Sequence, residues 1–584
     1  MSVRVRPRSI LIALFGATAV LLVVWAMAVP VFEAPDEPAH WQYARYLHDE
    51  GRLPLYRAGF EEANSPPLYY SVIAPLAVES RLPPSLKADG LATWPSSLAA
   101  PRLFLNSDRD FEWYQPILRA RLLTVGISLI TVWICYVMGA RIGGWPTGLI
   151  AAACVALLPQ FSFRAGSISN DAMVTMFAAA TTLSTIQLVR DGFTWGRGIW
   201  AAIMLAGAYL SKISAIALAA PLALAILASP GPLWMRIRRL SVLLVAAAIV
   251  LPWSARNVML YGDPFASNAM RDAVSYLITD RSLLSPYFLQ QFPKDLFKSF
   301  VGVFGWFTVD LPRWGYVGFI LFGLIALVGL ARGLWRRTID WRLAGVLAVT
   351  FAAVLAVVVH INLSFTQPQG RYMFPALPAI ALLMALGITH LPAFLASRAH
   401  ITVPAGLAAF NVYALCFVLI PAFYPPLARD VAPGIRVLYP SELSGMRLAT
   451  AAPTFRIDDL DAGWTVPVDV NADSFDTLEL ELASKLPGAP VVRGAVTFGA
   501  DAASLEDAAG ADRRITFEWR ADGGHQLVRI PLAQHRAWQR HIGVLRIEPI
   551  DGGAVDPRHQ QIALGPIHLF AEPTTRVGAA ASQR

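Results

Sequence analysis

Two adjacent carboxylates and a histidine follow the first long apolar run of the chain, within the segment from Ala34 to His40. Asp36 and His40 are four residues apart, so both side chains point the same way on a helix that begins at one of the prolines of this segment. A carboxylate and an imidazole at that spacing can accept and donate protons. The segment therefore predicts an acid–base pair at the point where a membrane span ends and water begins.

Further ionisable residues stand at the ends of apolar runs, where a charge is costly unless it is paired or functional. They are Asp171, Lys212, Arg256 and Arg371. A carboxylate can take the proton of an acceptor hydroxyl, and a cation can hold an anionic leaving group such as a phosphate. Arginine suits a phosphate because its fork of donors binds two oxygens at once. This combination predicts group transfer from a lipid phosphate.

The elements that must position these residues are membrane spans. Of the 584 residues, 55% are hydrophobic and 15% charged, which is too apolar for an ordinary soluble protein. The first eight residues carry three arginines and precede an uncharged run to Phe32, which is long enough to span a bilayer and longer than the apolar core of a signal peptide. We interpret it as a retained first helix with its N-terminus in the cytoplasm. Ten further apolar runs follow at about 118–140, 145–163, 171–190, 199–210, 213–230, 240–256, 315–331, 343–361, 373–390 and 402–423.

The basic residues between these runs indicate the orientation of the bundle. A net charge of +8 would suggest a nucleic-acid partner for a soluble protein. Here the basic residues cluster in short segments between apolar runs, which is the pattern of the positive-inside rule, so we predict no nucleic-acid partner. Counting about eleven spans, with the two short ones near residue 211 as a hairpin, places the candidate residues on the outer side. A first outer loop then covers about 33–116.

The composition changes from about Tyr424, after which no long apolar run appears. Short alternating segments separated by glycine-rich turns predict an antiparallel β-sandwich; they lie at 478–482, 515–519, 544–548 and 562–570. Their layout resembles a jelly-roll of the carbohydrate-binding type. We predict a helical membrane domain at 1–425, an extracytoplasmic β-sandwich at 440–573 and a disordered tail at 574–584. The three cysteines all lie in apolar runs, which indicates neither a disulfide framework nor a cysteine zinc site.

A series of short motifs carries a resemblance to a known group of enzymes. In chain order they are Pro35-Asp36-Glu37-Pro38-Ala39-His40, Asn170-Asp171, Ser211-Lys212-Ile213, Arg256-Asn257 and Gln369-Gly370-Arg371-Tyr372. In that order the pattern resembles the GT-C superfamily of polytopic glycosyltransferases, which includes protein O-mannosyltransferases and the aminoarabinose transferases of lipid A. The first motif is also similar to that of an allied family of bacterial predicted membrane proteins. The resemblance covers roughly residues 10 to 425.

The resemblance implies an inverting transfer of a sugar from a polyprenyl-phosphate donor. The acceptor would be a cell-envelope glycan, a lipid or a protein on the outer face of the bacterial cytoplasmic membrane. Asp36 is then the general base, with Glu37 as a second catalytic carboxylate beside it. The residues expected to bind the donor phosphate or the substrate are His40, Asn170, Asp171, Lys212, Arg256, Arg371 and Tyr372. Some members of the superfamily bind a divalent metal and others need none; if one binds here, its ligands would be Asp36 and Asp171.

Two other functions stay open on the sequence. A transporter or flippase of a lipid-linked glycan would also need cations along a path through the bundle. Against it, no midplane acidic series or pair of broken helices recurs in two halves of the chain. A bundle that only anchors the β-domain would need far fewer than eleven spans.

Each candidate residue also has a purely structural interpretation. Asp36, Glu37 and Asp171 could cap helices, because carboxylates favour the positive end of a helix dipole. His40 could be a hydrogen-bonded structural residue, and Lys212 could extend its ammonium group from an apolar hairpin to the interface. The two arginines could anchor span ends, although the positive-inside rule disfavours them on the outer side.

Overall fold

The computed structural model describes residues 7–571 with gaps at 57–60, 79–110, 274–277, 280, 424–427, 433, 439, 441, 449–453, 487–489, 502, 507–511, 552–555 and 559. The predicted tail at 574–584 and much of the predicted first outer loop lie outside these residues. The chain divides into two compact units, a helical unit of Met1–Arg81 with Phe111–Pro421, and a C-terminal unit of Leu82–Asp110 with Ala422–Arg584.

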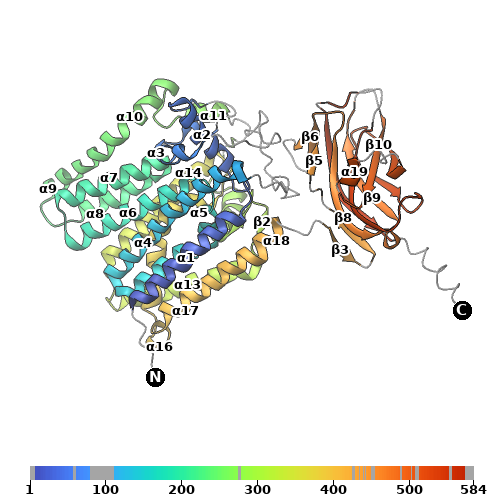
Figure 1. Ribbon diagram of the computed structural model, residues 1–584. Coiled ribbons are helices and arrows are strands. Elements are labelled where there is room, and N and C mark those ends of the chain that lie inside the picture. The colour runs from blue at the N-terminus through green and yellow to red at the C-terminus, as the bar shows by residue number, and fades with distance from the viewer. Residues whose placement is uncertain are drawn as a thin grey trace. The chain divides into compact units, whose positions relative to one another are not determined.

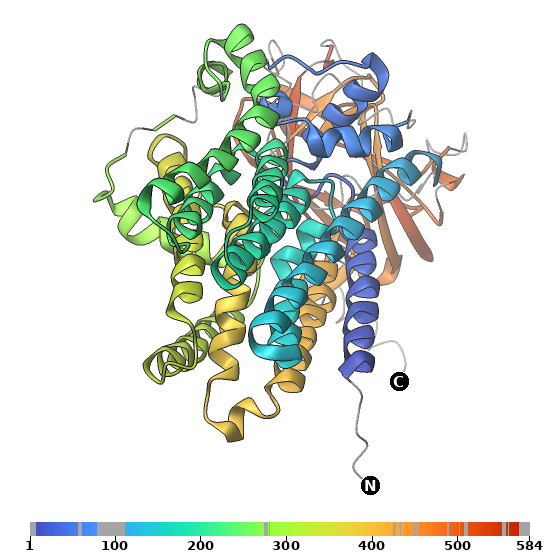
Figure 2. The ribbon, with the colours of Figure 1, turned by 90° about the vertical axis from the view of Figure 1, so that its left-hand side faces the viewer.

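The helical unit is built almost entirely of α-helices joined by short turns (Figures 1 and 2). A two-stranded hairpin, β1 (Val303–Phe304) with β2 (Val309–Asp310), and a 3₁₀ turn at Gly370–Ala376 interrupt them. The helices are α1 (Pro7–Ala28), α2 (Glu37–Glu50), α3 (Leu68–Ile73), α4 (Phe111–Ala156), α5 (Pro159–Ala165), α6 (Asn170–Asp191), α7 (Trp195–Ser211), α8 (Ala219–Leu227), α9 (Leu233–Arg239), α10 (Leu243–Tyr261), α11 (Ser267–Ala273), α12 (Phe292–Val301), α13 (Arg313–Trp335), α14 (Trp341–Ser364), α15 (Leu377–Thr389), α16 (Ala393–Ala396), α17 (Ala399–Tyr413) and α18 (Ile420–Phe423).

Eight helical segments of the described chain are long and apolar enough to cross a membrane. They are Ser9–Ala28, Gln115–Ala156, Asn170–Asp191, Leu233–Tyr261, Arg313–Trp335, Trp341–Ser364, Gly370–Thr389 and Ala399–Phe423, and a shorter apolar helix covers Ile213–Leu227. Every apolar run that the sequence predicts as a span falls on helix, so the helical membrane bundle is confirmed. The number of crossings and the side of the N-terminus stay predictions.

The longest helical segment, α4, covers two predicted spans and folds back on itself. Gly144 has φ 80° and ψ 176°, which no helix contains, and Pro146 follows it. A Cβ added at Gly139 would lie 2.7 Å from the Cα of Gly148, so the chain before the turn lies against the chain after it. The backbone therefore forms a helical hairpin, as two antiparallel spans require.

Small residues let the long helices approach closely, as is usual between helices in membranes. The helices α1 and α17 both pack along α4, and α13 packs against α15. At the α13–α15 contact, a Cβ added at Gly387 would lie 2.0 Å from the carbonyl oxygen of Ala326. Larger residues at this crossing would force the two helices apart.

The C-terminal unit contains two antiparallel sheets, which confirms the predicted β-region. One sheet has the strand order β11-β10-β13-β8-β5, and the other has the order β12-β9-β14-β4-β3, in which β14 also pairs with β7 and β7 pairs with β6. The four predicted segments fall on β9, β11, β13 and β14, whereas the first strand begins at Ala428, earlier than the predicted domain start at 440. The strands are β3 (Ala428–Ala432), β4 (Ile435–Leu438), β5 (Glu442–Ser444), β6 (Met446–Leu448), β7 (Thr454–Ile457), β8 (Gly463–Asn471), β9 (Thr477–Ser484), β10 (Val491–Gly499), β11 (Arg514–Arg520), β12 (Gln526–Pro531), β13 (His541–Glu548) and β14 (Gln561–Phe570).

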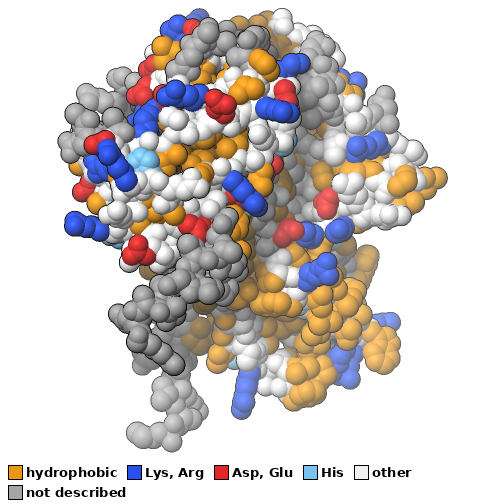
Figure 3. Space-filling model, turned by 90° about the vertical axis from the view of Figure 1, so that its right-hand side faces the viewer, with side chains coloured by type: hydrophobic (Ala, Val, Ile, Leu, Met, Phe, Trp, Pro, Cys, Tyr) orange, Lys and Arg blue, Asp and Glu red, His pale blue; other side chains and the backbone are white. Residues whose placement is uncertain are grey.

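The inward-facing residues of both sheets form one apolar core. Trp464 and Trp519 are buried in it, and alternate residues along β9, such as Leu478 and Leu480, point into it. Charged side chains of both signs are scattered over the face of this unit that Figure 3 shows. The alternation of apolar and polar residues in the sequence thus corresponds to strands that turn one face toward the core between two packed sheets.

Candidate active site

The chain turns sharply between the end of α1 and the start of α2. Asp36 is the residue before α2 and has a left-handed backbone with φ 65°, a conformation that aspartate tolerates better than most residues. Pro38 stands in the first turn of the helix, where its missing N–H costs nothing. The Asp36 side chain makes no capping hydrogen bond, so its carboxylate is available to other partners.

Asp36 forms an ion pair with Arg371, which lies 335 positions later in the chain at the 3₁₀ turn before α15. The other guanidinium nitrogen of Arg371 lies 3.8 Å from Asp171 Oδ2. Asp171 in turn accepts from Lys212 Nζ at 2.6 Å and from Arg164 at 3.2 Å. Three cations and two carboxylates are thereby joined, and the structure brings together four of the predicted site residues.

The two carboxylates of this cluster differ in access. The Asp36 side chain is 33% exposed, whereas that of Asp171 is 1% exposed. Burial acts to raise the pKa of the Asp36 carboxyl, but the positive charges of Arg371 and Arg164 and the hydrogen bond from Arg371 outweigh it, so the pKa of Asp36 lies below its ordinary value. Asp36 is therefore the ionised carboxylate of the cluster that is open to solvent.

Arg164 is a member of the cluster that sequence reasoning missed. Its guanidinium is buried and donates to Asp171, to the carbonyl of Pro35 at 2.8 Å and to Ser169 Oγ at 2.5 Å. These bonds tie the segment before Asp36 to the start of α6. One feature of the sequence could have identified Arg164 as a candidate: it is an arginine on the predicted outer side of the bundle, where the positive-inside rule disfavours basic residues.

Glu37 faces away from Asp36 and forms a separate, fully buried ion pair with Arg121 of α4. Arg121 donates from Nε to one carboxylate oxygen at 2.8 Å and from Nη2 to the other at 2.6 Å. The backbone N–H groups of Phe32 and Ile168 also donate to this carboxylate, each at 2.9 Å. Both side chains of the pair are 0% exposed. Since its oxygens are fully engaged and no substrate can reach them, we assign Glu37 a structural role in place of the predicted catalytic one.

His40 belongs to a third group, with Tyr70 and Glu62. His40 Nδ1 lies 2.8 Å from the Tyr70 hydroxyl, which donates to Glu62 at 3.1 Å. Burial lowers the pKa of His40, and the charges of Glu62 and Asp36 offset this only in part, so the ring is neutral at pH 7. Glu62 was not predicted as a site residue.

One set of described residues could hold a metal ion. A ligand atom from each of Asp36, His40 and Glu62 lies within 4.8 Å of the other two. Two carboxylates and an imidazole are a donor set that suits zinc or manganese. The predicted pairing of Asp36 with Asp171 fits a metal less well, because cations already surround Asp171.

The remaining predicted residues take different places. Asn170 is buried as the first residue of α6, and Ser169 rather than Asp171 caps that helix through its hydroxyl. The ring of Tyr372 lies 4.7 Å from Lys212 Nζ, beside the ion-pair cluster. Arg256 donates to the carbonyl of Pro54 at 2.6 Å, a contact with the segment that follows α2.

A family model describing dolichyl-phosphate-mannose-protein mannosyltransferases matches residues 115–255. The predicted resemblance to GT-C glycosyltransferases is confirmed. The matched segment contains Arg121, Arg164, Asp171 and Lys212, whereas Asp36 and Arg371 lie outside it. No curated protein matches the sequence.

Three solved structures are among those to which this chain is similar. ArnT from Cupriavidus metallidurans, bound to undecaprenyl phosphate, is 15% identical with a TM-score of 0.44, and the match covers 69% of this chain and 64% of that one. The oligosaccharyltransferase of Archaeoglobus fulgidus in its apo form is 13% identical with a TM-score of 0.38 over 70% and 55%. The arabinosyltransferase EmbB from Mycobacterium smegmatis is 10% identical with a TM-score of 0.37 over 95% and 64%. This chain spans less than two thirds of each of the three.

Proposed function

We propose that this protein is a membrane glycosyltransferase that moves a sugar from a polyprenyl-phosphate donor to an acceptor, with inversion at the anomeric carbon. The acceptor is a cell-envelope glycan, a lipid or a protein on the outer face of the bacterial cytoplasmic membrane. The observation that carries the proposal is the ion pair of Asp36 with Arg371. It places a reachable carboxylate beside a guanidinium, which are the two charges that such a transfer requires.

In this mechanism, the acceptor oxygen forms its bond to the anomeric carbon while the bond from that carbon to the phosphate oxygen breaks. The acceptor proton goes to the carboxylate of Asp36, and the departing phosphate keeps the electron pair of the broken bond. Arg371 stabilises the negative charge that develops on the phosphate. Lys212 and Arg164 hold Asp171, so the cluster keeps an excess positive charge for an anionic donor.

Donor binding would also prepare Asp36 for its role. In the free protein, Arg371 lowers the pKa of Asp36 and makes it a weak base. A donor phosphate competes for the same guanidinium, and its negative charge lies close to Asp36. Both effects raise the pKa of the carboxyl, so Asp36 becomes a stronger base when the donor is present.

If the enzyme uses a divalent cation, Asp36, His40 and Glu62 are the residues that would hold it. When bound there, such an ion would act as a Lewis acid toward the negative charge on the phosphate. The steps assigned above to Asp36 and Arg371 rest on the side chains alone.

The pH dependence distinguishes Asp36 from His40 as the base. A base acts in its deprotonated form, and the pKa of Asp36 lies below its ordinary value of 3.8 in the free protein. We therefore expect kcat/KM for the donor to stay flat between about pH 5.5 and 8, because this ratio reports groups of the free enzyme. The measurement uses vesicles with the same pH on both sides. An acid limb near pH 6 that disappears in His40→Gln would instead make His40 the base.

The test of the function uses the purified protein in vesicles with a polyprenyl-phosphate donor that carries a labelled sugar. We expect the label to appear in an acceptor fraction from a bacterial cell envelope, with release of polyprenyl phosphate. Passage of the intact lipid-linked sugar across the bilayer, with no change in covalent structure, would identify a transporter instead.

A further inference from the structure

Three buried hydrogen-bond donors on α2 and α10 have no acceptor. They are the hydroxyl of Tyr43, the Nη1 group of Arg256 and the indole N–H of Trp253. Among the described residues, no atom forms a hydrogen bond with any of the three. The side chains of Tyr43 and Trp253 are almost fully buried, at 0% and 4% exposure. Since a buried donor without an acceptor costs stability, three of them point to a ligand that supplies the acceptor atoms.

The guanidinium of Arg256 is the charged member of this group. Its Nη2 donates to the carbonyl of Pro54 at 2.6 Å, and its Cζ lies 5.2 Å from the centre of the Trp253 ring. Neither contact neutralises the charge, and within the described part of the chain no carboxylate forms an ion pair with it. The side chain is only half-buried, so an anion can approach it from solvent. An arginine at such a position makes strong, charge-assisted hydrogen bonds to a phosphate or a carboxylate.

The Tyr43 hydroxyl is suited to donate a hydrogen bond beside this charge. Burial raises the pKa of Tyr43, the charge of Arg256 acts to lower it, and the charge of Glu62 acts to raise it. The phenol therefore stays protonated at neutral pH. The Glu62 carboxylate accepts instead from Ser65 Oγ at 2.5 Å and from the Tyr70 hydroxyl at 3.1 Å.

A chain of contacts joins Tyr43 to the proposed base. The ring of Tyr43 stacks on that of Tyr70, with centroids 3.8 Å apart. The Tyr70 hydroxyl lies 2.8 Å from His40 Nδ1, and a ligand atom of His40 lies within 4.8 Å of one of Asp36. Tyr43 is seven residues after Asp36, which is roughly 10 Å along an α-helix. One acceptor molecule can therefore reach both places, with its hydroxyl at Asp36 and another group at Tyr43.

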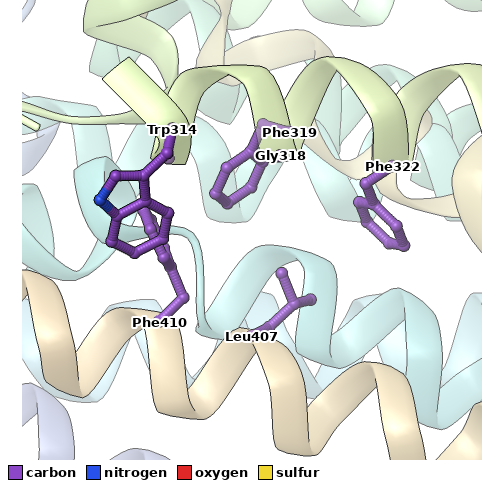
Figure 4. Close-up of a pocket in the computed structure, with 7 residues that line it drawn as sticks. Trp314, Gly318, Phe319, Phe322, Leu407 and Phe410 are labelled. Carbon is purple, nitrogen blue, oxygen red and sulfur yellow. The ribbon is translucent and has the colours of Figure 1, made fainter. Parts of the chain in front are cut away.

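The apolar groove between α13 and α17 suits a different kind of ligand (Figure 4). The ring centroids of Trp314 and Phe319 lie 5.5 and 5.4 Å from that of Phe410, and none of the residues that line this groove is charged. An anion would lose its hydration there without gaining a cation. Of these two places, the one at Arg256 is where an anionic group finds a positive charge.

We propose that Arg256 and Tyr43 bind an anionic group of the acceptor, a phosphate or a carboxylate, with the indole N–H of Trp253 as a third donor. The inference rests on the proposed function, because it takes the acceptor hydroxyl to lie at Asp36. It narrows the acceptor to a molecule that carries such a group near the hydroxyl that receives the sugar. It also gives the two arginines different ligands, with the donor phosphate at Arg371 and the acceptor at Arg256.

The first experiment varies the acceptor in the vesicle transfer assay. Samples of the cell-envelope acceptor fraction are stripped of phosphate groups, amidated at their carboxylates, or left untreated. We expect one of the two treatments to raise the apparent KM for the acceptor about tenfold or more, the range for a hydrogen bond to a charged group, and thereby to identify the anion. Arg256→Gln should cause a similar rise with the untreated fraction and little further change with the treated one. Its kcat and its KM for the donor should stay near wild type, because the lost contact is uniform binding of the acceptor.

The matched control is Arg52→Gln, since Arg52 stands on the same segment as Pro54, is 71% exposed and pairs with Glu50. We expect this variant to behave as wild type with every acceptor sample. The proposal is overturned if neither treatment changes the acceptor KM, or if Arg256→Gln raises the KM for the donor instead.

Tyr43→Phe separates binding from folding. Because the hydroxyl has no partner and the ring stacks on Tyr70, we expect this variant to keep the wild-type melting temperature. It should nevertheless raise the KM for the untreated acceptor about fivefold, the effect of one hydrogen bond. A fall in melting temperature with no change in this KM would make Tyr43 a structural residue and contradict its assignment.

The last experiment does not depend on transfer. The melting temperature of the detergent-solubilised protein is measured with millimolar glucose 6-phosphate, glucuronic acid or neutral glucose. We expect at least one anionic sugar, and not glucose, to raise it, and we expect this rise to vanish in Arg256→Gln but remain in Arg371→Gln and Arg52→Gln. Loss of the rise in Arg371→Gln alone, or its abolition by phosphatidylglycerol, would place the anion at the donor site or identify a lipid headgroup, and either result would overturn the proposal. A rise that depends on Arg256 in a protein that transfers no sugar would keep the anion site and remove the proposed function.

Discussion

Asp36→Asn is expected to lower the rate of sugar transfer by about 10³-fold, within the range that general bases contribute. The amide is nearly isosteric with the carboxylate but does not take up a proton at neutral pH. The KM for the donor should not rise, because loss of the Asp36 charge leaves Arg371 free to bind the phosphate. The measurement is single-turnover transfer in vesicles, compared with the amount of folded protein in the membrane.

The matched control for this change is Asp49→Asn. Asp49 lies on α2, the helix that follows Asp36; its side chain is exposed and forms an ion pair with Arg45 one turn away. We expect this variant to transfer sugar at the wild-type rate, because exposed pairs of this kind contribute little. If Asp36→Asn kept more than about a tenth of the wild-type rate, Asp36 would not be the base.

Arg121→Met is expected to destabilise the helical unit by about 3–5 kcal/mol, the cost of leaving a buried charge without its partner. Glu37 would remain fully buried with the backbone N–H groups of Phe32 and Ile168 still donating to it, but without a cation to balance its charge. Three carbonyls of residues 26–30 would also lose the guanidinium that they now share. The expected result is a large fall in melting temperature in detergent and reduced accumulation in the membrane. Glu37→Gln should cost less, because its amide oxygen can still accept one of the backbone bonds.

Arg119→Met provides the control for the Arg121 variant. Arg119 is two residues earlier on α4, and its guanidinium bonds to the side chain of Gln115 at an exposed site. This variant should keep the wild-type melting temperature. If Arg121→Met were as stable as wild type but failed to transfer sugar, the Glu37–Arg121 pair would have a functional role, and the predicted catalytic role of Glu37 would return.

The secondary structure of this chain is largely determined by local sequence. Apolar runs of about twenty residues have to satisfy their own backbone hydrogen bonds in lipid, so each predicted run is helical. The alternation at 478–482 likewise requires a strand with one buried face, which is β9. Charged residues at span ends are costly, and this cost is what marks Asp36, Asp171 and Arg371 as candidates without any structure.

The sequence alone could not assign a partner to each of these charges. Asp36 and Glu37 are neighbours in the chain, yet one pairs with Arg371 and the other with Arg121. The left-handed turn at Asp36 directs the two carboxylates to different partners, and the packing of α4 and α15 decides which cation meets which carboxylate. These pairs span 335 and 84 positions, so no local pattern encodes them.

The same reason explains which residues were missed. Arg121 stands near the start of the apolar run at about 118–140 and Arg164 directly follows the run at about 145–163, so both resemble ordinary span-end anchors. Glu62 stands in the predicted first outer loop, where the sequence shows no periodicity. The sequence therefore predicted that a base and phosphate-binding cations lie on one side of a helical bundle, and the structure brings Asp36, Asp171, Lys212 and Arg371 together. Only the tertiary structure showed that the Asp36 carboxylate is exposed, that Glu37 is buried in an ion pair with Arg121, and that Arg164 joins the ion-pair cluster of Asp36, Asp171, Lys212 and Arg371. The physical cause is that burial and ion pairing depend on contacts between distant segments, whereas helix and strand formation depend on neighbouring residues.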